Sequence, residues 1–170
     1  MELRIYPDPI LSEKCAKAEP DDSDIPKILE EMCEKLYQYD GAGLAAPQIG
    51  ILKRIIVADV REEPRRLYKM INPVITWKSE ETIESKEGCL SLPFLREKIF
   101  RHESITVEYL DENFIKQEIQ AFGFLSCCLQ HEIDHLDGIL YIDRLSRLKK
   151  SRAIRKFKKL QIENDPEDGI

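Results

Sequence analysis

The chain has 170 residues, of which 42% are hydrophobic and 34% are charged. This balance is typical of a globular protein that buries one substantial core, and we expect a single domain over residues 1–170. The net charge of -6 disfavours phosphate backbones and anionic membranes as partners, so sequence-specific nucleic-acid binding is not expected.

The N-terminal segment lacks the long apolar core of a signal peptide, because Glu2 and Pro7-Asp8-Pro9 interrupt it. No apolar run reaches the ~20 residues of a membrane span, so no membrane partner is expected. The five cysteines are an odd number without the spacing of paired bridges, which fits reduced thiols. We therefore expect a cytoplasmic protein whose thiolates can bind a metal.

The first predicted element is an amphipathic helix that begins after Asp24, carries Pro26 in its opening turn and stops at Gly41. It leads into a glycine-rich loop. Its apolar residues recur at helical spacing: Ile25, Ile28, Leu29, Met32, Cys33 and Leu36.

The middle of the chain predicts a sheet. Residues 54–59, 69–76 and 80–87 are short β-branched or alternating segments separated by proline-containing turns. Residues 104–109 and 115–121 alternate polar and apolar side chains on either side of a turn, which predicts a hairpin with one buried face.

Residues 124–136 predict a mostly buried helix that ends at Asp137-Gly138. Residues 146–160 predict a basic C-terminal helix, followed by an acidic tail over 161–170. The C-terminal helix carries a narrow apolar stripe, which comprises Leu148, Ile154, Phe157 and Leu160. Because helices and strands are segregated, we predict an α+β fold: antiparallel strands around a central metal-binding helix, with an N-terminal and a C-terminal helix.

The most informative motif, His131-Glu132-Ile133-Asp134-His135, lies within the predicted buried helix. Residues four apart share one helix face, so both imidazoles can reach one metal ion, while Glu132 borders the same site. This spacing suits a metal-activated water and its base. The alternative, two unrelated surface or core histidines, is weakened by the apolar residues that flank them.

A catalytic metal usually has three protein ligands, so one more is needed. Cys89 is the better candidate, because Gly88 and Pro93 favour an irregular backbone that can present a thiolate. His102, the remaining histidine, stands in a polar context and is interpreted as solvated or structural. Taken alone, however, Cys89 is more economically a small buried apolar residue, as are the other four cysteines.

The loop from Gly41 to Gly50 is built of small residues that let a ligand approach the backbone closely. Gln48 offers an amide N–H that can stabilise an oxyanion. A tightly packed loop after a helix is the alternative. It is not a phosphate loop, since the Lys-Ser/Thr ending is missing.

Three segments resemble, in order, the three motifs of the peptide deformylase family. They are Gly41-x-Gly43-Leu44-Ala45-Ala46-x-Gln48, Glu87-Gly88-Cys89-Leu90-Ser91 and Gln130-His131-Glu132-x-Asp134-His135-Leu136. The resemblance extends from Pro7 to about Leu145. Three residues depart from those usual in the family: Ala42, Phe114 and Ser126. The change at Ala42 would alter the pocket that holds the methionine of the substrate in this family.

The resemblance implies a metal-dependent amidase that hydrolyses the N-formyl group of N-formylmethionyl nascent polypeptides and releases formate. It implies that Cys89, His131 and His135 bind the metal and that Glu132 is the general acid/base. Gln48 and the backbone N–H of Leu90 would polarise the formyl oxygen. We expect the substrate to be bound by Ala42, Gly43, Gly88, Phe124, Cys127 and Cys128.

Ligand chemistry alone favours zinc in a mixed nitrogen and sulfur site. The resemblance instead implies Fe(II), with zinc, nickel or cobalt able to occupy the site. Each imidazole should also form a hydrogen bond through the ring nitrogen that does not bind the metal. Asp134, Gln130 and solvent are all possible partners for these bonds.

Nine basic residues lie between Arg144 and Lys159. A solvated helix face is one interpretation, and contact with the ribosome, implied by the resemblance, is the other. Two other function classes compete with deformylation. A zinc endopeptidase would tolerate loss of Cys89, and a non-catalytic metal-stabilised module would need neither Glu132 nor Gln48.

Overall fold

The structure, a computed structural model, describes residues 2–164. Its helices are α1 (Ile25–Gln38), α2 (Gly123–Leu136) and α3 (Arg147–Glu163), with short 3-10 turns at Pro9–Ser12, Ala46–Ile49 and Tyr141–Arg144. Its strands are β1 (Gly43–Ala45), β2 (Ile55–Ala58), β3 (Tyr68–Lys78), β4 (Thr82–Cys89), β5 (Leu92–His102), β6 (Ser104–Leu110) and β7 (Lys116–Phe122). The strands form a five-stranded sheet, in the order β1-β2-β3-β6-β7, and a separate β4–β5 hairpin.

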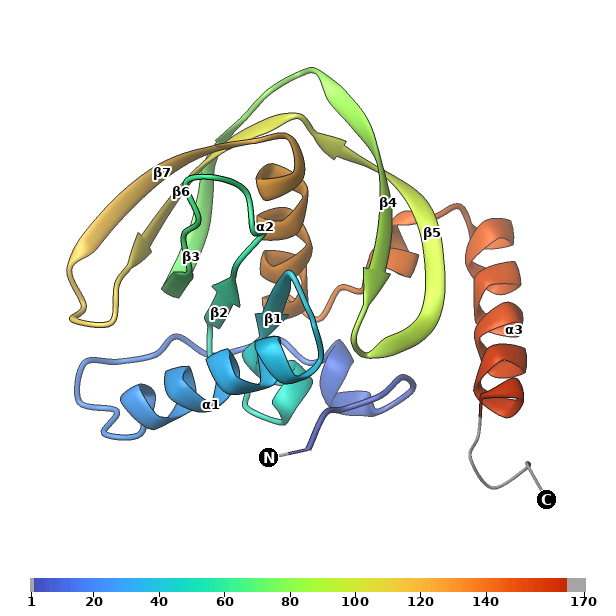
Figure 1. Cartoon of the computed structure of the whole chain (residues 1–170), viewed down its shortest axis with the longest axis horizontal. Coiled ribbons are helices and arrows are strands. Elements are labelled where there is room, and N and C mark those ends of the chain that lie inside the picture. Colours follow the sequence, from blue (N-terminus) through green and yellow to red (C-terminus); the bar gives the residue numbers. More distant parts are fainter. Residues whose placement is uncertain (1, 165–170) are drawn as a thin grey trace.

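Helix α2 lies between the five-stranded sheet and the β4–β5 hairpin (Figure 1). Helix α3 packs on β5 at the outer side of the hairpin, and α1 packs on β1 and β2. All pairings between the named strands are antiparallel. The predicted α+β fold around a central helix is therefore confirmed.

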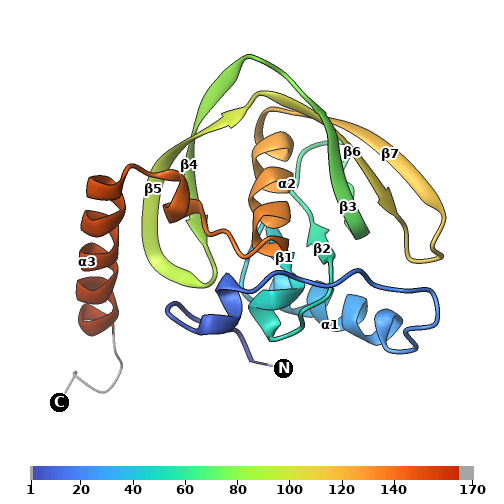
Figure 2. The same cartoon turned by 180° about the vertical axis from the view of Figure 1, so that it is seen from behind.

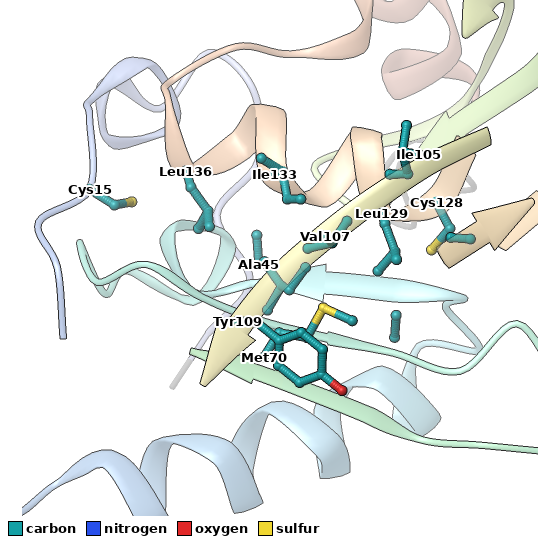
Figure 3. Packing of buried hydrophobic residues seen from close by; sticks show 13 residues of the cluster. Cys15, Ala45, Met70, Ile105, Val107, Tyr109, Cys128, Leu129, Ile133 and Leu136 are labelled. Atoms are coloured by element: carbon teal, nitrogen blue, oxygen red, sulfur yellow. The ribbon is translucent and has the colours of Figure 1, made fainter. Parts of the chain in front are cut away.

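Helix α2 is fixed by its apolar face. Figure 3 shows Leu129, Ile133 and Leu136 of α2 in a cluster with Val107 and Met70 of the sheet. Each fully buried aliphatic side chain of this kind contributes about 1.5–3 kcal/mol relative to exposure. The helix that carries the histidine pair thus has little freedom to shift.

Strand β2 is buried at every position, because the sheet is covered on both faces here. Ile56 and Ala58 belong to the cluster that contains α2 residues, whereas Ile55 and Val57 belong to the cluster with α1. A continuous apolar run is expected for a strand covered on both sides. The strand of the glycine-rich loop pairs with it, Gly43 opposite Ala58.

Strand β5 was not predicted. Its inward positions are Leu95, Glu97, Ile99 and Arg101, so charged residues occupy two of the four. Of these two, Arg101 is buried and Glu97 is partly buried. The expected irregularity near Gly88 is present, since the register between β4 and β5 shifts between Gly88 and Cys89.

Two further expectations differ from the structure. The glycine-rich loop contains β1 and a 3-10 turn. Leu148, expected on the apolar stripe of the last helix, is 60% exposed, whereas Ala153 and Phe157 are buried. The rings of Phe157 and Tyr6 meet edge to face, with centroids 6.0 Å apart. Figure 2 shows the N-terminal segment and α3 from behind. Asp165, Glu167 and Asp168 of the predicted acidic tail lie outside the described residues.

Within residues 2–164, no helix combines the length and the apolar character needed to cross a lipid bilayer.

Candidate metal centre and active site

Two segments of the chain bring a sulfur and two imidazoles together. Cys89 is the last residue of β4, and His131 and His135 lie one turn apart on α2. One donor atom from each residue lies within 4.8 Å of the other two, and Cys89 Sγ is 3.3 Å from His135 Nε2. A thiolate with two imidazole nitrogens is a donor set that suits a divalent transition metal. The residues present therefore fit the metal that the motif predicts.

The His131 ring is held from two sides. Its Nδ1 lies 2.8 Å from Glu87 Oε2, and the Tyr141 ring stacks on it with centroids 5.7 Å apart. Because Nδ1 is engaged, Nε2 is the nitrogen left to face a metal. Burial alone would raise the pKa of Glu87, but hydrogen bonds from Arg101 and His131 lower it to about 2. Glu87 is therefore a carboxylate that accepts the Nδ1–H.

Glu87 was not predicted from the sequence, which left Asp134, Gln130 and solvent open as the imidazole partners. Asp134 instead pairs with Arg101 and Arg144, and Gln130 bonds to the backbone of His102. His102 itself bonds to the Ser79 carbonyl oxygen, away from the metal donors, in keeping with a structural role. The available signal was position, since Glu87 stands two residues before Cys89 in the second motif.

Glu132 is 4% exposed and has its carboxylate at the cleft. Burial is the main cause that raises the pKa of Glu132, to about 7. Its Oε2 accepts no hydrogen bond from any described residue. A carboxyl group with a pKa near neutrality can both accept and return a proton. The Gly43 backbone leaves the space that Glu132 fills, since a Cβ at position 43 would lie 2.4 Å from Glu132 Oε1.

The Gln48 side chain is fixed at both ends. Its Oε1 accepts a hydrogen bond from the Ala45 N–H at 2.9 Å. Its Nε2 donates to Ser91 Oγ at 3.1 Å and lies 3.4 Å from Cys89 Sγ. This orientation places the amide N–H groups beside the Cys89 sulfur at the cleft, where they can act as hydrogen-bond donors. Leu90 lies in the turn between Cys89 and Ser91.

These residues line a cleft with a volume of about 760 Å³. Its lining contains Gln48, Cys89, Leu90, His131 and Glu132, together with the predicted substrate contacts Ala42, Gly43, Gly88, Phe124, Cys127 and Cys128. His135 does not line the cleft and is 1% exposed. Burial raises the pKa of the Cys127 and Cys128 thiols, so both act as neutral lining. The structure thus brings the predicted site residues other than His135 together around one cavity, and His135 lies behind the Cys89 sulfur at 3.3 Å.

Other parts of the cleft wall were not foreseen from the sequence. Leu3 and Ile5 come from the N-terminal segment, Tyr39 follows α1, and Phe94 belongs to the unpredicted strand β5. No motif marks these positions, because their place at the cleft follows from how distant segments pack.

One wall of the cleft, residues 39–42, is anchored by Asp59. The Asp59 N–H donates to the Ala42 carbonyl oxygen at 2.9 Å. The Asp59 carboxylate is 1% exposed and accepts hydrogen bonds from Tyr37 Oη at 2.9 Å and Arg65 Nε at 3.0 Å. Arg61 adds an ion pair of 2.6 Å to Asp40. The wall is therefore fastened to the segment that follows β2.

The site combines a His-Glu-x-x-His helix, a cysteine sulfur from a sheet hairpin and a buried carboxylate of raised pKa. This combination is typical of metal-dependent hydrolases. The family model described as polypeptide deformylase matches residues 1–151. The chain therefore belongs to the polypeptide deformylase family, hydrolases that remove the N-formyl group from nascent peptides.

Proteins of this family are similar to the chain over nearly its whole length. The peptide deformylase of Thermodesulfovibrio yellowstonii is 47% identical over 160 residues, which cover 93% of this chain and 96% of the relative. The crystal structure of the Ehrlichia chaffeensis enzyme in complex with actinonin matches with a TM-score of 0.89 and 41% identity, covering 95% of this chain and 97% of that one. The enzyme from Thermus thermophilus matches with a TM-score of 0.85 and 42% identity, covering 95% of each chain.

Proposed function

We propose that Cys89, His131 and His135 hold one divalent metal ion and that Glu132 is the general acid/base of N-formylmethionyl peptide hydrolysis. The observation that carries this assignment is the convergence of one sulfur and two imidazoles near a cleft that the buried Glu132 also lines. A divalent ion held there supplies Lewis acidity, which lowers the pKa of a water molecule toward about 7 and polarises a carbonyl group.

The residues of the chain then divide the remaining work. Glu132 takes the proton of the attacking water and returns it to the leaving amine of methionine, a transfer that a pKa of about 7 favours in both directions. Gln48 Nε2 and the backbone N–H of Leu90 donate hydrogen bonds to the formyl oxygen. Removal of one such donor costs about 3 kcal/mol of barrier in comparable sites.

The apolar part of the cleft binds the methionine side chain. Ala42, Phe124, Cys127 and Cys128 supply the lining, and a weak hydrogen bond of 3.5 Å from Cys128 Sγ to the Ala42 oxygen ties its two sides together. Gly43 and Gly88 present bare backbone to the peptide.

The test is formate release from formyl-Met-Ala-Ser by the wild type, Cys89→Ala and Glu132→Ala, with bound metal measured in parallel. We expect Cys89→Ala to lose metal and activity, and Glu132→Ala to keep metal and lose activity. Cys33→Ala is the matched control, because Cys33 is a half-buried thiol of α1 outside the cleft. Full activity in Cys89→Ala, or cleavage of internal peptide bonds instead of formate release, would contradict the assignment and favour a zinc endopeptidase.

We propose Fe(II) as the native ion, with zinc, nickel or cobalt able to replace it. The mixed nitrogen and sulfur donor set accepts all four. Elemental analysis of protein purified without oxygen checks the identity, and zinc as the sole metal of such a preparation would contradict it.

We also propose that the chain is a single cytoplasmic catalytic domain whose α3 contacts the ribosome. Ala153 and Phe157 turn one face of α3 toward the protein, which leaves Arg155 and Lys158 exposed. Cosedimentation with ribosomes should weaken as salt rises, with a smaller slope in Arg155→Gln/Lys158→Gln than in wild type. Salt-independent binding, or none, would contradict this contact.

A further inference from the structure

We propose that Arg144 is a positioning residue for the metal centre, acting through three buried side chains on the His131 ring. The inference rests on the proposed metal site and goes beyond it, because Arg144 lies outside the cleft and outside the three motifs.

The first step of the link joins Arg144 to Asp134. Arg144 ends the short helix at Tyr141–Arg144 and turns its guanidinium back onto α2. Its Nε lies 2.9 Å from Asp134 Oδ2, and its Nη2 bonds to Asp134 Oδ1. Two parallel contacts of this kind fix both the position and the orientation of a carboxylate.

The second step joins Asp134 to Glu87 through Arg101. Arg101 Nη1 donates to Asp134 Oδ2 at 2.6 Å. The other side of the same guanidinium donates to Glu87, from Nε at 2.7 Å and from Nη2 at 2.9 Å. Arg101 is 3% exposed, so its position is set by these two carboxylates. The third step is the 2.8 Å contact from Glu87 to His131 Nδ1.

Charge balance explains why Arg144 affects His131 at the other end of this link. Glu87, Arg101, Asp134 and Arg144 alternate in sign, so each buried carboxylate has a guanidinium of its own. Without Arg144, Arg101 alone would serve both carboxylates, and Asp134 would compete with Glu87 for it. A Glu87 that loses part of its contact with Arg101 holds the His131 ring less firmly.

Arg144 is also the most exposed of these four side chains. Its side chain is 45% exposed, against 3% for Arg101, 6% for Glu87 and 11% for Asp134. Solvent screens its pair with Asp134, so the effect at His131 is smaller than that of removing a direct partner, which typically costs 10–100-fold in metal affinity.

The experiment compares Arg144→Gln with Arg147→Gln, which removes the same charge from a neighbouring exposed arginine outside the row. The readouts are the NMR signal of His131 Nδ1–H, in metal-free and zinc-loaded protein, and the rate at which a chelator removes zinc. In Arg144→Gln we expect the Nδ1–H signal to shift and to exchange faster with water, and zinc loss to accelerate about 3- to 10-fold. Arg144→Lys, which keeps the charge but only part of the geometry, should lie between.

An unchanged His131 signal and zinc release rate in Arg144→Gln would overturn the proposal, even if the variant unfolds at a lower temperature. Equal changes in Arg147→Gln would overturn it too, since they would reflect net charge alone. The metal-free signal also separates this inference from the metal assignment. A wild type that binds no zinc would refute the proposed function, whereas the shift of the Nδ1–H signal would still decide the link.

Discussion

Replacing Gly43 by alanine tests whether the space beside Glu132 is needed for catalysis. A Cβ at position 43 would lie 2.4 Å from Glu132 Oε1, 2.7 Å from its Cγ and 2.8 Å from its Cδ. Unstrained contacts begin near 3.5 Å, so the carboxylate must retreat by about 1 Å. The backbone of Gly43 is not in the left-handed region, and alanine therefore adds no conformational strain of its own.

A displacement of about 1 Å in a catalytic group can cost 10²-fold in rate, which corresponds to about 2.7 kcal/mol of barrier. Overpacking of the site also costs about 1–3 kcal/mol of folding free energy. We therefore expect kcat/KM for formate release to fall about 10²-fold, while the protein stays folded in thermal unfolding.

A double mutant isolates the steric cause. Glu132→Ala removes the Cγ, Cδ and Oε1 atoms that the new Cβ would meet, so Gly43→Ala should cost far less folding free energy in that background than in wild type. Gly41→Ala is the control, because its Cβ would meet the flexible tips of Leu90 and Leu36, at 3.1 and 3.2 Å, and the Gly43 carbonyl oxygen at 3.4 Å, with no contact to Glu132 among these three. A folded Gly43→Ala enzyme with wild-type kcat/KM would refute the reasoning, as would an equal loss of folding free energy in both backgrounds.

Three further outcomes are expected. Ser91→Ala removes the acceptor for Gln48 Nε2 and should lower kcat/KM about 10-fold; unchanged kinetics would show that Ala45 alone holds the amide. Burial raises the pKa of Asp59, but hydrogen bonds from Arg65 and Tyr37 lower that pKa overall. The Asp59 carboxylate therefore stabilises the fold above pH about 4, and this stabilisation is lost in more acidic solution. The stability difference between wild type and Asp59→Asn in urea unfolding should therefore be constant near neutral pH and shrink below pH about 4, and a difference independent of pH would contradict this account. Gly138 has a φ of +71°, and a Cβ added there would lie 2.4 Å from the Ser12 carbonyl oxygen. Gly138→Ala should therefore lower the free energy of unfolding by at least about 2 kcal/mol. An unaltered Tm in thermal unfolding would contradict this expectation.

The elements that the sequence predicts well are those whose pattern reflects one simple environment. Helix α1 has one apolar stripe, and α2 carries a motif whose i, i+4 spacing has meaning only on a helix. For the same reason the two histidines and Glu132 were predictable as one site. Cys89 required the resemblance to a family, because a single cysteine carries no periodicity.

The features that escaped prediction depend on buried charge and on distant pairing. Arg101 occupies an inward position of β5, and a charged residue there hides the alternation that indicates a strand. Its partner Glu87 is 14 residues away, and Glu87 is 44 residues from His131. Local patterns cannot show such pairs, since only the antiparallel register of β4 and β5 and the packing of α2 bring them together.

The three proposed metal donors come from segments that lie far apart along the chain. The sulfur comes from a hairpin that pairs within itself, whereas both imidazoles follow 42 and 46 residues later, after β6 and β7. Contacts between neighbours in the chain form early in folding, and those that close long loops form late. In a copy still being synthesised, the three proposed donors therefore cannot meet until residue 135 has joined the fold.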